Sequence, residues 1–364
     1  MKYRVTEASI GDQEKRYVND ALDNSEVSSM GSYVRDFESH YADHCGVKHA
    51  LATSNGTTAL HLALIALGIS PGDEVIVPDL TFVATANAVV YCGATPVFVD
   101  VDPDYWAMDP EQVNKKITSK TKAIIAVHLY GHPANVQELR SICTLNNLYL
   151  IEDAAEAHGA FCFDERVGSL GDINCFSFYG NKILTTGEGG MVTTNSDDLA
   201  YLVKQYRDQG THQDRRYWHP VIGYNYRMTN LSAAVGLAQL ERIDEIVEKK
   251  EVILQKYKKY LVEAPLKFQV SQPWAKPVNW LTSVVLTSSA PISASRLMVL
   301  LSEMEIETRP FFIPMHELPP YLSKESFPVA EELSKNGINL PSAISLKDSD
   351  IKYICDATLS ILNQ

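Results

Sequence analysis

The sequence lacks the long apolar runs and paired cysteines that mark membrane-spanning and disulfide-rich proteins. No stretch approaches the roughly 18 apolar residues that a membrane-spanning helix requires. The first 23 residues carry charges throughout, so we expect no signal peptide. The six cysteines are scattered, with no CxxC pair and no His/Cys cluster at zinc-site spacing. We therefore expect reduced thiols and a cytoplasmic protein.

Positive charge is also scarce, with 32 Lys and Arg residues against 45 Asp and Glu residues and a net charge of -13. An acidic chain of this kind is not expected to bind nucleic acid or an anionic membrane. A pocket on such a protein can still be locally basic and accept a small anion. At 364 residues, the chain is long enough for one large domain and a smaller one.

Short β-branched runs alternate with helical stretches from about residue 50 onward. The expected strands lie near residues 74–78, 96–101, 122–131, 148–153, 173–180 and 189–195. The expected helices between them cover residues 55–69, 81–93 and 135–147. This alternation predicts an α/β domain with a mostly parallel sheet between helical layers.

The pattern changes in the last third of the chain. Residues 229–258 form a long predicted helical region, because apolar residues recur every three positions from Leu231 to Ile246. A strand near 280–287 and a helix near 293–304 then predict a small α+β unit. We therefore expect a large domain over 1–245 and a small domain over 246–364, with residues 1–35 as an N-terminal arm packing near the small domain.

The segment TSNGTTAL, residues 53–60, predicts a turn that leads into a helix. Backbone N–H groups at such a helix start can hold a phosphate, with Gly56 allowing close approach and Thr57 donating its hydroxyl. An ordinary helix cap by Ser54 or Asn55 is the alternative explanation.

The segment IEDAAEAHG, residues 151–159, places Glu152 and Asp153 at the end of a strand predicted to be central. Ligand-binding residues collect at the carboxyl ends of strands in open α/β sheets. Two carboxylates there are costly unless a positive group pairs with them. A metal site without a matching His/Asp cluster, or a cap for a following AAEAHG helix, are the alternatives.

Lys182 lies in FSFYGNKILTTGEGG, residues 176–190, between an apolar strand and a glycine-rich turn. Burial lowers the pKa of a lysine and makes it a competent amine nucleophile, as Schiff-base chemistry requires. A lysine that extends from a strand edge to solvent is the alternative. The glycines lack the GxGxxG spacing of a dinucleotide site.

Taken in chain order, these segments offer what pyridoxal 5′-phosphate (PLP) needs. The cofactor requires a phosphate cradle, a flat group over its ring, a carboxylate at its ring nitrogen and a lysine that bonds to its aldehyde.

The sequence resembles the DegT/DnrJ/EryC1/StrS family of sugar aminotransferases. The matching segments cover most of residues 50–245 in the family's order and include SNGTTALHLAL, GDEVIVP, TFVATANA, GATPVFVDVD, IEDAAEAHG, GDINCFSFYGNKILTTGEGG and GYNYRMTNLSAAVGLAQLERID. The resemblance extends to ETRPFFIPMH at 307–316. It implies the fold type I (aspartate aminotransferase-like) architecture, which is α/β with a small C-terminal α+β domain.

The resemblance also implies roles for individual residues. Lys182 would bond to PLP and later move the proton, Asp153 would pair with the ring nitrogen, and Phe82 would stack on the ring. Glu156 stands where the family more often has a glutamine that contacts the 3-hydroxyl of the cofactor. A carboxylate at this position would have to share a proton or be compensated.

Further implied contacts involve the phosphate and the nucleotide sugar. The phosphate would be held by Gly56, Thr57 and Ser177, together with Asn225 from the neighbouring subunit. Asn225 in that role implies a homodimer with shared active sites. The candidates for the sugar nucleotide are basic and aromatic residues, namely Arg215, Tyr217, Trp218, His219, Arg227, Arg309 and His316.

Within the family, the resemblance implies transfer of an amino group from L-glutamate to C4 of GDP-4-keto-6-deoxy-D-mannose. The products would be 2-oxoglutarate and GDP-perosamine, a precursor of O-antigen, with pyridoxamine 5′-phosphate as the intermediate form of the cofactor. The main alternative is amination of another nucleotide-linked keto-sugar, either a UDP-4-keto hexose or a GDP-3-keto sugar. A dehydratase relative has histidine at the position of Lys182, and a regulatory protein would not need the cofactor residues.

Overall fold

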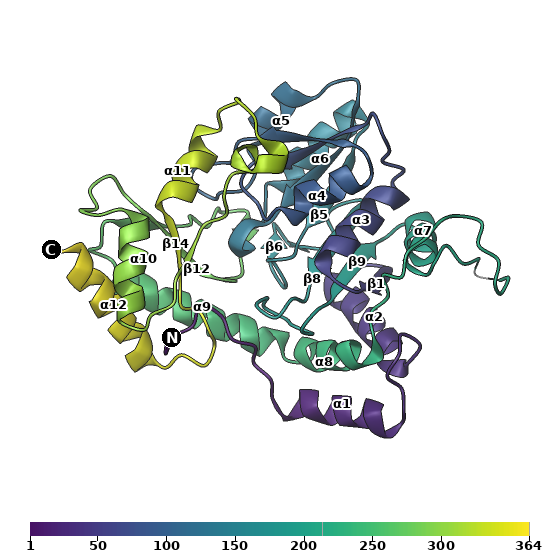
Figure 1. The fold of residues 1–364 in the computed structure, drawn as a ribbon, viewed down its shortest axis with the longest axis horizontal. Coiled ribbons are helices and arrows are strands. Elements are labelled where there is room, and N and C mark those ends of the chain that lie inside the picture. Colours follow the sequence, from purple (N-terminus) through teal and green to yellow (C-terminus); the bar gives the residue numbers. More distant parts are fainter. Residues whose placement is uncertain (213, 364) are drawn as a thin grey trace.

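The computed structural model describes residues 1–212 and 214–363, and a mixed sheet forms the centre of its larger part (Figure 1). In the described residues this sheet has seven strands, in the order β1-β9-β8-β5-β4-β2-β3. Their bounds are β1 His49–Thr53, β2 Glu74–Pro78, β3 Thr95–Val99, β4 Thr121–Val127, β5 Tyr149–Asp153, β8 Ile173–Ser177 and β9 Gly190–Thr194. The pairs from β3 through β2, β4 and β5 to β8 are parallel, whereas β9 runs antiparallel to both neighbours.

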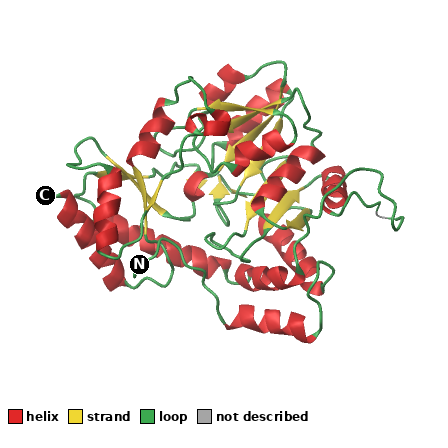
Figure 2. Cartoon of the chain, viewed as in Figure 1, coloured by secondary structure: helices red, strands yellow, loops and turns green. Residues whose placement is uncertain are grey.

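Helices cover both faces of this sheet, and the α/β class with a mostly parallel sheet is confirmed (Figure 2). One face packs against α3 Gly56–Ala66, α4 Ala84–Tyr91 and α7 Asp197–Arg207. The other packs against α2 Ser32–Cys45, α5 Pro110–Lys116, α6 Val136–Asn146 and α8 Asn230–Leu240. Strands that are buried along their whole length, such as β8, suit a sheet covered on both sides.

The predicted helical region over 229–258 consists of two helices, α8 and α9 Ile243–Tyr260. The backbone leaves helical geometry at Arg242, where φ is -124° and ψ is 23°. The Arg242 guanidinium forms an ion pair with Glu14 at 2.8 Å and also hydrogen-bonds to Ser9. This contact with the N-terminal segment, which includes α1 Asp12–Asp23, accompanies the break between the helices.

A four-stranded sheet lies in the C-terminal part of the described chain, in the order β10-β12-β14-β13. Its strands are β10 Leu266–Phe268, β12 Thr282–Leu286, β13 Arg309–Pro310 and β14 Gly337–Leu340. The same part of the chain contains the helices α10 Ala294–Glu303, α11 Pro328–Asn336 and α12 Asp348–Leu362. A small additional sheet joins β11 Ala275–Lys276 to β6 Phe161–Cys162 and β7 Glu165–Arg166. No helix in the described chain is long and apolar enough to cross a membrane.

Two contacts bear on the predicted division of the chain. Tyr3 pairs with Ile306 in a parallel bridge, so the N-terminus lies against the C-terminal sheet region. Helix α9 contributes Ile246 to the core beneath the large sheet, and Ile253 and Tyr257 to a separate core around the smaller sheet. The boundary at residue 245 and the arm over 1–35 stay predictions.

Helix α9 also carries Lys250, a lysine that is only 6% exposed. Its ammonium group donates hydrogen bonds to the carbonyl oxygens of Trp280 and Ser342, at 2.8 and 2.9 Å. Burial lowers the pKa of Lys250 from 10.5 to about 7. In the unfolded chain the amine regains its ordinary pKa, so between these two values the unfolded state binds a proton that the folded state does not.

Lys250 therefore makes the folded state more stable as the pH rises through this window. We expect the free energy of unfolding of the wild type, relative to Lys250→Met, to increase by about 2 kcal/mol between pH 7 and pH 9. Urea unfolding of both proteins at the two pH values measures this change. A difference that stays constant or shrinks with rising pH would contradict the burial of a titrating amine at this position.

Candidate active site

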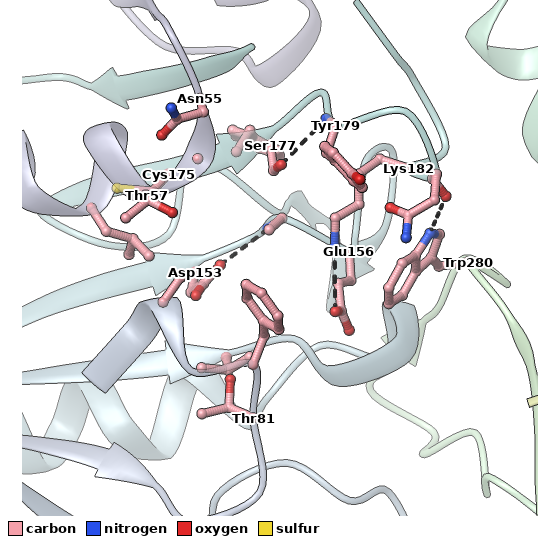
Figure 3. A pocket seen from close by; sticks show the side chains of 18 of the residues that line it. Asn55, Thr57, Thr81, Asp153, Glu156, Cys175, Ser177, Tyr179, Lys182 and Trp280 are labelled. Atoms are coloured by element: carbon pink, nitrogen blue, oxygen red, sulfur yellow. Dashed lines mark hydrogen bonds and ion pairs between the residues drawn. The ribbon is translucent and has the colours of Figure 1, made fainter. Parts of the chain in front are cut away.

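A cavity of about 530 Å³ opens at the carboxyl ends of β5 and β8 (Figure 3). Asp153 is the last residue of β5 and Ser177 is the last residue of β8, and these two parallel strands are neighbours. The cavity, called here the central pocket, brings together seven of the predicted site residues: Gly56, Thr57, Phe82, Asp153, Glu156, Ser177 and Lys182. Trp280 and Phe312, from the C-terminal part of the chain, complete its wall.

Asp153 presents its carboxylate to the pocket, while the preceding Glu152 points to the opposite side of the strand. Thr85 donates its hydroxyl to Asp153 Oδ2 at 2.8 Å, and the Ala155 N–H donates to Oδ1 at 3.3 Å. Burial raises the pKa of Asp153, and the hydrogen bond from Thr85 opposes this increase. Glu152 Oε2 lies 2.8 Å from His128 Nε2, on the side of the strand away from the pocket, so the two carboxylates do not share one site.

The segment after Asp153 differs from one expectation. Residues 154–159 form turns and not the helix that the AAEAHG alternative assumed. Gly159 has a φ of +86°, a backbone conformation that would be strained in a residue with a side chain. The Ala157 N–H donates to the Ala154 carbonyl at 3.0 Å and closes a turn. These turns bring Glu156 back beneath the pocket, close to Lys182.

Lys182 enters the pocket from the loop between β8 and β9, and its side chain is 11% exposed. Its Nζ lies 3.4 Å from Glu156 Oε1 (Figure 3). Glu156 Oε2 accepts the backbone N–H of Tyr130 at 2.7 Å. Burial raises the pKa of Glu156, and the charge of Lys182 opposes the increase. The carboxylate in place of the commoner glutamine is thus compensated by an amine and by a backbone donor.

The start of α3 faces Ser177 across the pocket. Asn55 caps this helix by accepting the Thr58 N–H at 2.9 Å, which bears out the capping alternative. The N–H groups of Gly56 and Thr57 precede the first intrahelical bond and so have no acceptor within the helix. A Cβ on Gly56 would lie 2.7 Å from Ser177 Cβ, so the helix start can approach Ser177 this closely only with glycine.

A buried chain of hydrogen bonds supports Ser177 from behind. His158 Nε2 donates to the Ser177 carbonyl at 2.9 Å, and the Tyr41 hydroxyl donates to His158 Nδ1 at 2.8 Å. This tautomer follows because a carbonyl can only accept. Burial lowers the pKa of His158 to about 3, so the ring remains neutral near pH 7.

The predicted substrate residues lie outside the lining of the central pocket in the described chain. The described residues between α7 and Asn225 project away from the body of the protein (Figure 1), and among them Tyr217 is 78% exposed and Trp218 is 48% exposed. Arg215 packs over the Trp218 ring at 4.2 Å, and His219 contacts the Gln209 carbonyl at 3.0 Å.

Three further candidates have partners elsewhere. Arg227 pairs with Asp208 at 2.9 Å and binds the Asn225 amide oxygen at 3.0 Å. Arg309 pairs with Glu307 at 3.2 Å. His316 is buried, and its Nδ1 lies 2.7 Å from an oxygen of the buried Asp79. The substrate roles of these residues, and the phosphate contact of Asn225 from a neighbouring subunit, stay predictions.

The profile of the DegT/DnrJ/EryC1/StrS aminotransferase family matches residues 8–359. The chain belongs to this family. It is therefore a PLP-dependent aminotransferase, and the recognition of the family from sequence segments is confirmed.

Individual relatives match over nearly their whole length. The chain is 45% identical to a GDP-perosamine synthase of Vibrio cholerae, over 99% of both chains. It is 47% identical to a GDP-perosamine synthase of Escherichia coli O157:H7, over 98% of both chains. Among solved structures, DesV of S. venezuelae in complex with a ketimine intermediate has a TM-score of 0.91 and 33% identity, over 97% of this chain and 95% of that one.

The central pocket fits PLP on the evidence of its own donors. An anion can lie between the unpaired N–H groups of α3 and the Ser177 hydroxyl, where only glycine leaves space. Among the described residues, the buried Asp153 carboxylate has no positive partner within hydrogen-bond distance, and a protonated ring nitrogen would supply one. Phe82, 55% exposed at the rim, offers a flat face above them.

Four residues that shape the site were missed from the sequence, namely Thr85, Tyr130, His158 and Trp280. Thr85 follows Phe82 by one helical turn, and His158 follows Glu156 by two residues, so both were within reach of the motifs. Tyr130 contributes a backbone N–H, for which side-chain patterns carry no signal. Trp280 comes from a segment 98 positions after Lys182, and only the folded chain shows that it lines the pocket.

Adding a methyl group at Gly56 should weaken cofactor binding. In Gly56→Ala the new Cβ forces Ser177 or the start of α3 to move, so we expect the Kd for PLP to rise about tenfold or more. Titration of the apoprotein with PLP, followed by visible absorbance, measures this. Gly180→Ala is the matched control, because a Cβ there meets only the Gly187 carbonyl at 3.9 Å. Equal affinities of the two variants would disprove the close-approach role.

Glu156→Ala should lower the free energy of unfolding more than Glu156→Gln does. Glu156→Ala leaves the buried Tyr130 N–H without an acceptor, which we expect to cost about 1–3 kcal/mol in the free energy of unfolding. Glu156→Gln retains an oxygen acceptor and should lose less than about 1 kcal/mol. Urea unfolding of the apoproteins compares them. Equal losses in both variants would show that the Tyr130 contact contributes nothing.

Proposed function

We propose that this enzyme transfers an amino group from L-glutamate to C4 of GDP-4-keto-6-deoxy-D-mannose, giving GDP-perosamine and 2-oxoglutarate. The observation that carries the proposal is the full-length identity of 45–47% to GDP-perosamine synthases, far above the 33% to DesV. The product would serve O-antigen synthesis, and the reaction would take place in the cytoplasm.

The residues of the central pocket have distinct proposed tasks. Gly56, Thr57 and Ser177 would hold the phosphate of PLP, and Phe82 would cover one face of its ring. Asp153 would pair with the ring nitrogen and keep it protonated. When bound, PLP supplies an aldehyde that accepts the amino group and a ring that withdraws electrons from the reacting carbon.

Lys182 is the proposed catalytic residue. In the resting enzyme it would hold the cofactor through its aldehyde, and the incoming amino group of L-glutamate would displace it and free its Nζ. The freed Nζ would then take the proton from the α-carbon of L-glutamate and return one at C4 of the sugar in the second half-reaction. Glu156, anchored by the Tyr130 N–H, orients the amine and can share its proton. The low exposure of both side chains keeps water from competing for that proton.

A homodimer with shared active sites would complete the pocket. Asn225 is exposed, and the neighbouring segment projects from its own subunit with large apolar groups uncovered, including Ile222 at 91% exposure. Such exposure suits a surface that meets a partner. In this arrangement Asn225 would reach the phosphate of the partner subunit, and the aromatic and basic residues nearby would approach its sugar nucleotide.

The specific assignment is tested with purified enzyme, PLP, L-glutamate and a panel of GDP- and UDP-linked keto-sugars. We expect amination of GDP-4-keto-6-deoxy-D-mannose at C4, identified by mass and NMR. We expect Lys182→Ala to lower turnover by about a thousandfold or more, because the proton carrier is lost, while circular dichroism shows an intact fold.

Two outcomes would count against this assignment. Amination of a UDP-4-keto hexose or a GDP-3-keto sugar, without turnover of the GDP-4-keto sugar, would replace the substrate but retain the family chemistry. Full activity of Lys182→Ala would remove the role given to the lysine.

A further inference from the structure

Trp280 is held at three points, so its indole ring has one orientation. Its carbonyl oxygen accepts a hydrogen bond from Lys250 Nζ at 2.8 Å, and its Nε1 donates to the Asn181 carbonyl at 2.7 Å. Its ring lies nearly parallel to the Tyr130 ring, with centroids 6.2 Å apart and an angle of 23° between planes. Trp280 is only 3% exposed although it lines the central pocket.

This orientation places the indole ring directly against the lysine of the site. Lys182 Nζ lies 3.8 Å from the centroid of the Trp280 ring and 3.4 Å from Glu156 Oε1 (Figure 3). A cation is attracted to the face of a tryptophan, and the ring also restricts the rotamers of the four-carbon lysine stem. The amine is therefore held between an aromatic face and a carboxylate, inside the pocket.

Lys250 is an unusual way to hold the Trp280 backbone. It is buried without a carboxylate partner among the described residues, and both of its acceptors are main-chain carbonyls. One belongs to Trp280, just before β12, and the other to Ser342, just after β14. Burying an amine is costly, and methionine would fill similar space without that cost. What Lys250 provides, and methionine could not, is the pair of hydrogen bonds to these two carbonyls.

A neutral amine matches this environment, because its two N–H groups satisfy the two carbonyls. The lowered pKa of Lys250 agrees with such a state. Asn279 adds a further tie, since its side-chain amide donates to the Lys250 carbonyl at 3.2 Å and to the Thr282 hydroxyl at 3.3 Å. The segment that carries Trp280 is thus bound to α9 from both directions.

We propose that Lys250 is a positioning residue for the reaction: through the Trp280 carbonyl it fixes the indole ring that holds Lys182 Nζ in the central pocket. The proposal rests on the proposed function in one respect, that Lys182 is the reacting lysine. Lys250 itself touches no reacting atom, and its effect passes through Trp280.

The first test uses the apoprotein and PLP alone, without sugar or L-glutamate. The rate constant for reaction of Lys182 with PLP is followed by visible absorbance. We expect Lys250→Met to lower it about fivefold, which corresponds to about 1 kcal/mol in activation free energy. Lys249→Met is the matched control, because Lys249 is exposed and its one ion pair in the described part of the chain is with Glu245, one turn earlier on α9. An unchanged or increased rate constant in Lys250→Met would overturn the proposal.

A double-mutant cycle separates positioning from a general loss of structure. Trp280→Leu removes the ring, and we expect it to lower the same rate constant by at least about fivefold. In that background Lys250→Met should add less than about twofold, because its route to Lys182 is already gone. Multiplying effects in the double variant would overturn the proposal and leave Lys250 as a structural tie alone.

A spectroscopic readout reports on Trp280 directly. The near-ultraviolet dichroism of the wild type minus that of Trp280→Leu isolates the signal of this indole, and Lys250→Met should weaken that signal while Lys249→Met preserves it. If Lys250→Met does not fold, Lys250→Gln carries the test, since its shorter amide can still donate and should produce a smaller loss. An unaltered Trp280 signal in a folded Lys250 variant would overturn the proposal. None of these measurements depends on which sugar is aminated, so their failure is distinct from failure of the proposed function.

Discussion

The pairing of Lys182 with Glu156 takes place where little water reaches, and much of the surrounding structure makes that burial tolerable. Taking two charges out of water costs more than an ordinary ion pair returns, unless further hydrogen bonds satisfy them. Glu156 gains the Tyr130 N–H, and the amine gains the face of Trp280. A buried pair of this kind adds little net stability, so its value to the protein lies in the geometry that it imposes on the amine.

The sheet topology explains why these groups meet at one place. Parallel strands β5 and β8 end at the same edge, where Asp153 lies opposite Cys175 and Ser177 follows two residues later on β8. The chain then reverses into the antiparallel β9, and the connecting loop returns over that edge with Lys182. The Lys182 N–H donates to the Tyr179 carbonyl at 2.9 Å, which fixes the start of the return. Lys182 thus follows β8 in the sequence, and the loop places it over the end of that strand.

Much of this arrangement could be predicted from the sequence because its signals are local. Continuous β-branched runs gave strands close to those observed, and β2 was predicted over its observed range. The predicted cofactor residues that line the central pocket lie between Gly56 and Lys182 around one sheet edge, so their order in the chain carries spatial information.

What the sequence did not reveal depends on contacts between distant segments. The break at Arg242 accompanies an ion pair with Glu14, more than 200 positions earlier. Compensation of Glu156 requires the backbone N–H of Tyr130, held where φ is +55°, a conformation that no side-chain pattern announces in a tyrosine. The basic and aromatic residues of the segment 209–223 can be identified from the sequence. The site that they would reach depends on the proposed dimer.

The residues that line the central pocket differ in how exposed they are. This difference bears on how two substrates can enter the pocket one after the other. Phe82 is 55% exposed at one side, whereas Trp280 is 3% exposed at the other. A wall tied to α9, to Asn181 and to Tyr130 cannot swing without losing two hydrogen bonds and a ring-stacking contact at once. We therefore expect entry and release at the Phe82 side, with the Trp280 side as the fixed reference for the amine in the proposed function. In the proposed function Lys182 serves both half-reactions, and a fixed wall would let the same Nζ serve both substrates without being repositioned between them.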